Sequence, residues 1–198
     1  MNEFLFYLQL GFTHVMDIKA YDHVLFLIVL VVSYSFKQWK NLLWLVSLFT
    51  LGHSLSLALS AYKIVSVNSD LVEFLIPLTI FLTALKNIFS GVKSNSNSKI
   101  LLLFSFCFGW IHGLGFSSYF KMLIADSDTK LMELIEFSLG IELAQLVIVV
   151  GVLLPYFIGN TIFKISKTHW VLVLSAMVMG ITIPMLIERY GPFMEHFF

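Results

Sequence analysis

The chain is poor in cysteine and in charged side chains, and each shortage excludes a class of protein. A single cysteine, Cys107, cannot form an internal disulfide, so the chain is not a disulfide-stabilised secreted scaffold. Only 12% of the residues are charged, whereas soluble domains carry about 25%. Basic and acidic residues are equal in number, 12 of each, so no net charge would attract nucleic acid.

Apolar residues are what the chain has in excess. They make up 59% of it, and the mean hydropathy is +0.91. A soluble domain of 198 residues has no core large enough to bury that much apolar surface. We therefore expect one integral membrane domain over residues 1–198 with an all-α fold, a polytopic transmembrane helix bundle in a lipid bilayer.

Apolar runs of helical length recur along the chain. A hydrocarbon core about 30 Å thick needs roughly 20 apolar residues per helix. Six runs meet or approach that length: Tyr21 to Phe36, Leu42 to Tyr62, Leu71 to Ser90, Ile100 to Phe120, Leu131 to Ile158 and Trp170 to Ile187. An earlier and shorter run, Phe4 to Val15, is a short span, a re-entrant helix or an interfacial helix. The sequence therefore predicts seven helices with a short first one, or six spans if the first does not cross.

The segments between these runs alternate in the sign of their charge. Three of them contain lysines and no acid: Lys37, Lys40, Lys86, Lys93, Lys99, Lys164 and Lys167. The alternate segments hold nearly all the acids. The positive-inside rule places the lysine segments in the cytoplasm. With seven spans in a bacterial inner membrane, the N-terminus would be cytoplasmic and the C-terminus periplasmic.

Polar side chains within or next to the expected spans are few. Such groups are costly in lipid, so they usually face the bundle interior and serve a function. One group gathers at the first outward turn: His14, Asp17, Asp22 and His23. A second group falls near mid-membrane on three different helices: His53, His112 and Glu142. We expect a polar path that opens outward at the first group and ends at the second.

Imidazole and carboxylate groups ligate nickel, cobalt, zinc and iron, and this set offers no thiolate. All seven residues are therefore candidate ligands for a divalent transition metal such as nickel, cobalt or zinc. Any one intramembrane histidine is equally well explained by an interhelical hydrogen bond, worth about 0.6 kcal/mol. Glu142 is harder to explain in this way, because a mid-span carboxylate needs a cation, a proton or a partner.

Five motifs, in order over about residues 10–150, resemble the HupE/UreJ family of hydrogenase and urease accessory membrane proteins. The first contains both Gly11-Phe-Thr-His14 and Tyr21-Asp22-His23, and the other four contain Gly52-His53-Ser54, Leu71-Val-Glu73, Ile111-His112-Gly113 and Gly140-Ile-Glu142. The resemblance implies movement of nickel, or of a similar ion such as cobalt, for metalloenzyme assembly, with metalloenzyme-assembly proteins as partners. It also implies a set of ligands or pathway residues: His14, Asp22, His23, His53 and His112, with Glu142 a further candidate.

The first motif departs from the family pattern. In many members the first histidine and the Asp-His pair are closer together and are separated by a glycine. Here the residues from Asp17 to Tyr21 intervene, and Asp17 either replaces a ligand or extends the turn. The identity of the metal therefore stays open.

Three functions fit these residues. The first and favoured one is a permease for a divalent metal, which needs binding strong enough to capture the ion and weak enough to release it. The second is an intramembrane zinc hydrolase that acts on a lipid amide or ester. The third is a sensor or assembly factor in which a metal only holds helices together. Two sites along a path favour transport, and one compact site with an open position favours hydrolysis.

Overall fold

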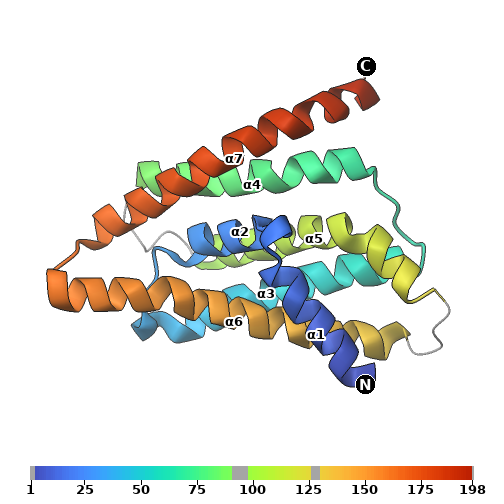
Figure 1. Cartoon of the computed structure of the whole chain (residues 1–198), viewed down its shortest axis with the longest axis horizontal. Coiled ribbons are helices and arrows are strands. Elements are labelled where there is room, and N and C mark those ends of the chain that lie inside the picture. The colour runs from blue at the N-terminus through green and yellow to red at the C-terminus, as the bar shows by residue number, and fades with distance from the viewer. Residues whose placement is uncertain (1–2, 91–97, 126–129, 198) are drawn as a thin grey trace.

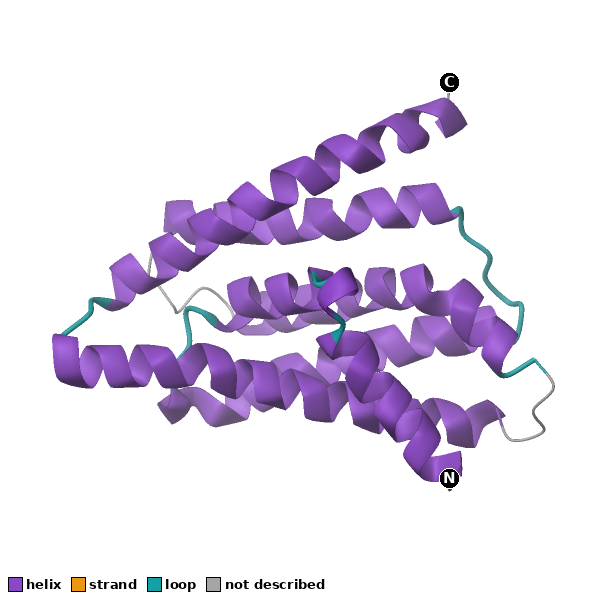
Figure 2. Ribbon diagram, in the orientation of Figure 1, coloured by secondary structure: helices purple, strands orange, loops and turns teal. Residues whose placement is uncertain are grey.

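The computed structural model describes residues 3–90, 98–125 and 130–197, and these residues form a helical bundle without strands (Figure 1 and Figure 2). Seven α-helices follow one another: α1 Glu3–Met16, α2 Asp22–Val31, α3 Trp39–Ala61, α4 Ser69–Ser90, α5 Ser98–Leu123, α6 Lys130–Phe163 and α7 Lys167–Phe197. Two short 3-10 turns, η1 Ile18–Ala20 and η2 Phe36–Gln38, precede α2 and α3. The predicted seven-helix bundle with a short first helix is confirmed.

Not every expected span is a helix long enough to cross the membrane. Five helices, α3 to α7, are long and apolar enough to cross a membrane. The run expected from Tyr21 to Phe36 instead forms α2, which has 10 residues and ends at Val31. At 1.5 Å per residue, α2 is about 15 Å long, roughly half the thickness of the hydrocarbon core.

The helices α1 and α2 share one pass through the bundle. Figure 1 shows α1 starting at the end of the bundle that carries both termini and ending near the middle. There α2 begins and continues to the opposite end. The break has a local cause, because the Asp17 side chain accepts a hydrogen bond from the Lys19 backbone N–H at 2.9 Å. A side chain bonded to its own backbone in this way competes with helix continuation.

This arrangement differs from the orientation expected for seven spans. Because α1 and α2 together traverse the bundle once, both termini lie at the same end of it (Figure 1). The lysine-bearing connections α2–α3 and α6–α7 lie at the other end, as do the end of α4 and the start of α5. The sequence could not reveal this arrangement, since the number of apolar runs does not say which two of them make a single pass.

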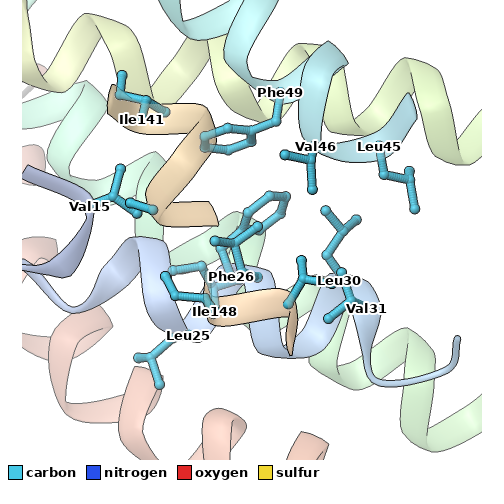
Figure 3. Packing of buried hydrophobic residues seen from close by; sticks show 14 of the residues in the cluster. Val15, Leu25, Phe26, Leu30, Val31, Leu45, Val46, Phe49, Ile141 and Ile148 are labelled. Carbon is cyan, nitrogen blue, oxygen red and sulfur yellow. The ribbon is translucent and has the colours of Figure 1, made fainter. Parts of the chain in front are cut away.

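The short helix α2 lies in the centre of the bundle, against α4, α6 and α7. Seven of its 10 residues are buried. Figure 3 shows Phe26 and Leu30 packed near Val46 and Phe49 of α3 and Ile148 of α6. The Phe26 and Phe49 rings stack with centroids 5.1 Å apart. An apolar helix that is buried on nearly every side belongs to the interior of the bundle.

Glycines allow the closest helix pairs to form. Gly52 of α3 packs on the backbone of α5, and Gly109 of α5 packs on the backbone of α3. Gly11 of α1 and Gly140 of α6 make the same reciprocal contact. A Cβ atom at any of these positions would overlap a backbone carbonyl of the facing helix. Small residues bring membrane helices together because dispersion contacts and not hydrophobic burial drive their association.

The shared pass predicts that both ends of the chain face the same side of the membrane. In a Cys107→Ser background, we expect Glu3→Cys and Glu195→Cys to react with an impermeant maleimide added to intact cells. We expect Lys37→Cys to react only after permeabilisation, because the lysine segments face the cytoplasm. Protection of Glu3→Cys together with labelling of Glu195→Cys would contradict the shared pass and restore seven spans.

Candidate metal centre

Four histidines from four helices converge in the middle of the bundle. His14 lies in the last turn of α1, His23 in the first turn of α2, His53 on α3 and His112 on α5. The ring centroids of His14 and His23 are 4.7 Å apart, and those of His23 and His112 are 5.2 Å apart. One ring nitrogen each of His14, His23 and His53 lies within 4.8 Å of the other two.

Local structure explains how these four side chains meet. The break after Met16 puts the end of α1 and the start of α2 at the same depth, so His14 and His23 become neighbours. The close pair α3–α5 brings the other two together, because Gly113 sits directly against the carbonyl of His53. His112 is the residue before Gly113, so the same close approach that the glycine permits carries its ring into the cluster.

Two of the imidazoles are held by hydrogen bonds at Nδ1. The Asp22 carboxylate accepts from His23 Nδ1 at 2.9 Å, and the Phe108 carbonyl accepts from His112 Nδ1 at 2.8 Å. Such bonds fix the tautomer and leave Nε2 as the free donor atom, as is typical of metal-binding histidines. Asp22 therefore orients His23 in this structure, and its role as a ligand stays a prediction.

Each of the four rings keeps a buried nitrogen without a hydrogen-bond partner among the described residues: His14 Nε2, His23 Nε2, both nitrogens of His53, and His112 Nε2. An unsatisfied buried polar atom costs about 1–3 kcal/mol. His53 is fully buried, so no solvent offsets that cost. Neutral imidazole nitrogens gathered at one point are suitable ligands for nickel, cobalt or zinc, so the residues present fit such an ion.

Aromatic side chains enclose the cluster. The ring centroids of Phe116 and His14 are 3.9 Å apart, and those of Phe49 and His112 are 5.4 Å apart. Phe137 of α6 stands 5.8 Å from His14. An apolar shell of this kind limits the access of water to the imidazoles and lowers the local dielectric constant. With neutral histidines, Asp22 gives the site a net negative charge, which favours a bound cation.

The other predicted residues lie outside the cluster. Asp17 is exposed and caps η1. It lines a cavity of about 720 Å³ together with His14, Lys19 and residues of α5. Glu142 accepts a hydrogen bond from Ser47 at 2.5 Å and lines a different cavity between α3 and α6.

The expectation of one outer and one deeper group therefore differs from the structure. His14 and His23 join His53 and His112 at one level, and Glu142 stands apart. The physical reason is the break between α1 and α2, which lies in the middle of the bundle and not at its surface (Figure 1). A depth estimated from sequence spacing assumes that each helix ends at the membrane boundary.

Two buried carboxylates on α6 received no role from the sequence. Glu133 and Glu136 are each 8% exposed, and the Tyr7 hydroxyl of α1 hydrogen-bonds Glu133. Glu133 and Glu136 are three residues apart at the start of an apolar run, so they lie on one helix face. This spacing is the sequence signal that could have found them.

Removing a ring of the cluster should abolish tight metal binding. We expect His23→Ala and His53→Ala each to weaken the binding of Co²⁺ or Ni²⁺ to metal-stripped protein by more than about 100-fold. Loss of a residue that only supports a ligand costs up to about 100-fold in affinity, and loss of the ligand itself should cost more. His169→Ala is the matched control, because His169 is exposed at the start of α7. Equal affinities for all three variants would contradict a metal site in this cluster.

Replacing Asp22 should weaken binding without changing the ligands. We expect Asp22→Asn to lower Co²⁺ affinity about 10- to 100-fold, because an amide supports the His23 imidazole less well than a carboxylate does. At saturation, the visible spectrum of bound Co²⁺ should match that of the wild type. A changed spectrum in Asp22→Asn would mean that the carboxylate is itself a ligand.

Comparison with known proteins agrees with the resemblance carried by the motifs. A family model described as HupE / UreJ protein matches residues 1–189. The match includes all four histidines of the cluster and reaches well into α7. Neither the curated proteins nor the solved structures contain a match to the chain.

Proposed function

The chain belongs to the HupE/UreJ family, and on this basis and that of the histidine cluster we propose that it is a membrane permease for nickel or a cobalt-like divalent ion. Family membership implies an accessory membrane protein that handles nickel or cobalt. The observation that carries the proposal is the convergence of three buried imidazoles and the half-buried His14 in the middle of a membrane bundle. Each of the four rings has a buried nitrogen with no partner among the described residues.

An open cavity supports an access route to the cluster. His14 lines the cavity of about 720 Å³ and also belongs to the cluster, so it connects the two. The charged side chains of Asp17 and Lys19 face this space from the turn between α1 and α2. Irregular backbone at membrane depth is tolerated only against protein or a water-filled cavity. A hydrated vestibule in which Asp17 attracts the cation before His14 receives it satisfies that requirement.

The opposite side of the cluster is closed by three phenylalanines. Phe26, Phe49 and Phe108 each lie about one helical turn from a histidine of the same helix, on the side of the lysine-bearing end. Phe26 lies with its ring centroid 5.1 Å from that of Phe49 and 5.2 Å from that of Phe108. This plug separates the cluster from the lysine end, so release toward the cytoplasm requires these rings to move apart.

The donor set suits a transported ion. Neutral imidazoles bind nickel and cobalt well, and a set without thiolates releases them more readily than a cysteine site would. The Asp22 carboxylate is hydrogen-bonded to His23 of the cluster. The site therefore combines selectivity for transition metals with a moderate net charge.

The compactness of the cluster supports a second candidate, an intramembrane zinc hydrolase. Three histidines at one point could hold zinc and leave a coordination position for water. The adjoining cavity is lined largely by apolar side chains, which would accept a lipid chain. Against this candidate, Asp22 is engaged with His23 and Glu142 lies on the α3–α6 side, so neither of these two carboxylates is placed as a general base.

Transport in liposomes tests both candidates. We expect purified protein to carry Ni²⁺ or Co²⁺ to a chelating dye trapped inside the vesicles. We expect His53→Ala to abolish that flux and His169→Ala to preserve it, because only His53 belongs to the cluster. Zinc-dependent release of fatty acid from bilayer lipid, without metal uptake, would overturn the permease and establish the hydrolase.

A further inference from the structure

A second group of polar side chains lies between α3 and α6. Ser47, Thr50 and Ser54 follow one another at helical spacing on α3, and Ser138 and Glu142 do so on α6. Residues three and four apart share a helix face, so the α3 hydroxyls form one stripe toward α6. His53 is adjacent to Ser54 in sequence and therefore points about 100° away from this stripe, into the histidine cluster.

Hydrogen bonds across the helix pair join these side chains. Ser47 Oγ donates to Glu142 Oε1 at 2.5 Å, and the hydroxyls of Ser54 and Ser138 are 2.5 Å apart. Between them along α3, Thr50 Oγ1 donates to Gln145 Oε1 at 3.2 Å. The amide nitrogen of Gln145 is fully buried and has no partner among the described residues. The α3–α6 contact is thus organised by polar bonds as well as by packing.

A cavity opens at Glu142. It has a volume of about 290 Å³ and is lined by the three α3 hydroxyls, Ser138, Glu142 and apolar residues of both helices. Among the described residues that line it, Glu142 is the one titratable group. Within the described part of the chain, no lysine, arginine or histidine forms an ion pair with Glu142. The polar groups that face this carboxyl group from α3 are hydroxyls.

A carboxylate at this depth must be neutralised. Glu142 lies near the middle of the apolar part of α6, where an isolated negative charge is costly. Hydroxyl and carboxyl oxygens suit hard cations, whereas imidazole nitrogens suit transition metals. The two polar groups on either side of α3 therefore differ in the class of cation that they would take.

We propose that Glu142 and Ser47 form an exchangeable site for a hard monovalent cation, either a proton or Na⁺, that is separate from the histidine cluster. Occupancy of this site would alternate with that of the cluster during transport. The link is mechanical, because α3 carries both Ser47 and His53, and α6 packs through Gly140 on α1, which carries His14. The coupling rests on the proposed permease function, whereas cation binding at Glu142 does not.

Infrared difference spectroscopy of the protein in vesicles tests the binding step directly. The probe is the C=O stretch of a protonated carboxyl group, recorded on raising the pH and, at fixed pH, on exchanging choline chloride for sodium chloride. We expect a band that is present in wild type, absent in Glu142→Gln and shifted in Ser47→Ala. Loss of the band with pH alone identifies the proton, and loss with Na⁺ at fixed pH identifies sodium. A spectrum that Glu142→Gln leaves unchanged overturns the site.

Transport and metal binding measured together test the coupling. We expect Glu142→Gln to keep wild-type Ni²⁺ affinity, which also reports correct folding, while Ni²⁺ flux and its dependence on the pH or Na⁺ gradient fall at least about tenfold. Glu188→Gln is the matched control, because Glu188 is an exposed carboxylate on α7. Loss of Ni²⁺ affinity in Glu142→Gln would place the carboxylate in the metal site and overturn two separate sites. Unchanged flux would overturn the coupling.

The two proposals fail in different ways. If wild type carries no metal but the Glu142 band responds to pH or Na⁺, the permease function is wrong and the cation site stands. If wild type carries metal and Glu142→Gln leaves the infrared spectrum unchanged, the permease stands and the cation site is wrong.

Discussion

Polar groups inside a bilayer must find partners within the protein, and this constraint shapes the whole bundle. Four imidazoles meet at one point, and a buried nitrogen of each has no partner in the part of the chain that the structure describes. Packing elsewhere is arranged to allow this: α2 is short, α1 stops halfway, and glycines bring α3 against α5. Because unsatisfied nitrogens in an apolar shell are costly, a site of this kind is best explained by a cation that spends part of its time there.

The broken first pass gives the bundle an asymmetry that a set of continuous helices would lack. On one side of the cluster, the turn at Asp17 opens into a cavity. On the other side, Phe26 and Phe49 stack and close the way to the lysine end. Discontinuous helices that meet at a midplane site are a known solution for membrane transport, because they expose irregular backbone only where it lines a cavity. An ion reaching the cluster from the cavity would therefore meet a closed inner side.

The helix α3 has a central position in this arrangement. It presents His53 to the cluster and Ser47 to Glu142 of α6, so its two faces bear different ligand chemistries. One face offers nitrogen donors in an aromatic shell, and the other offers oxygen donors beside a small cavity. A shift of α3 relative to α6 would alter both at once. This is the kind of shared rigid element through which two sites in one protein influence each other.

Apolar length and lysine distribution were enough to predict a membrane bundle of seven helices, because the thickness of lipid and the cost of burying charge act on any sequence in the same way. The same cost marked His14, His23, His53 and His112 as residues with a function. Only the tertiary structure decided that these four meet at one point, that Asp22 holds His23, and that Glu142 faces away from them. The reason is that the meeting depends on where α1 breaks and on how closely glycines let α3 approach α5, and both are properties of the packed chain that no spacing along the sequence encodes.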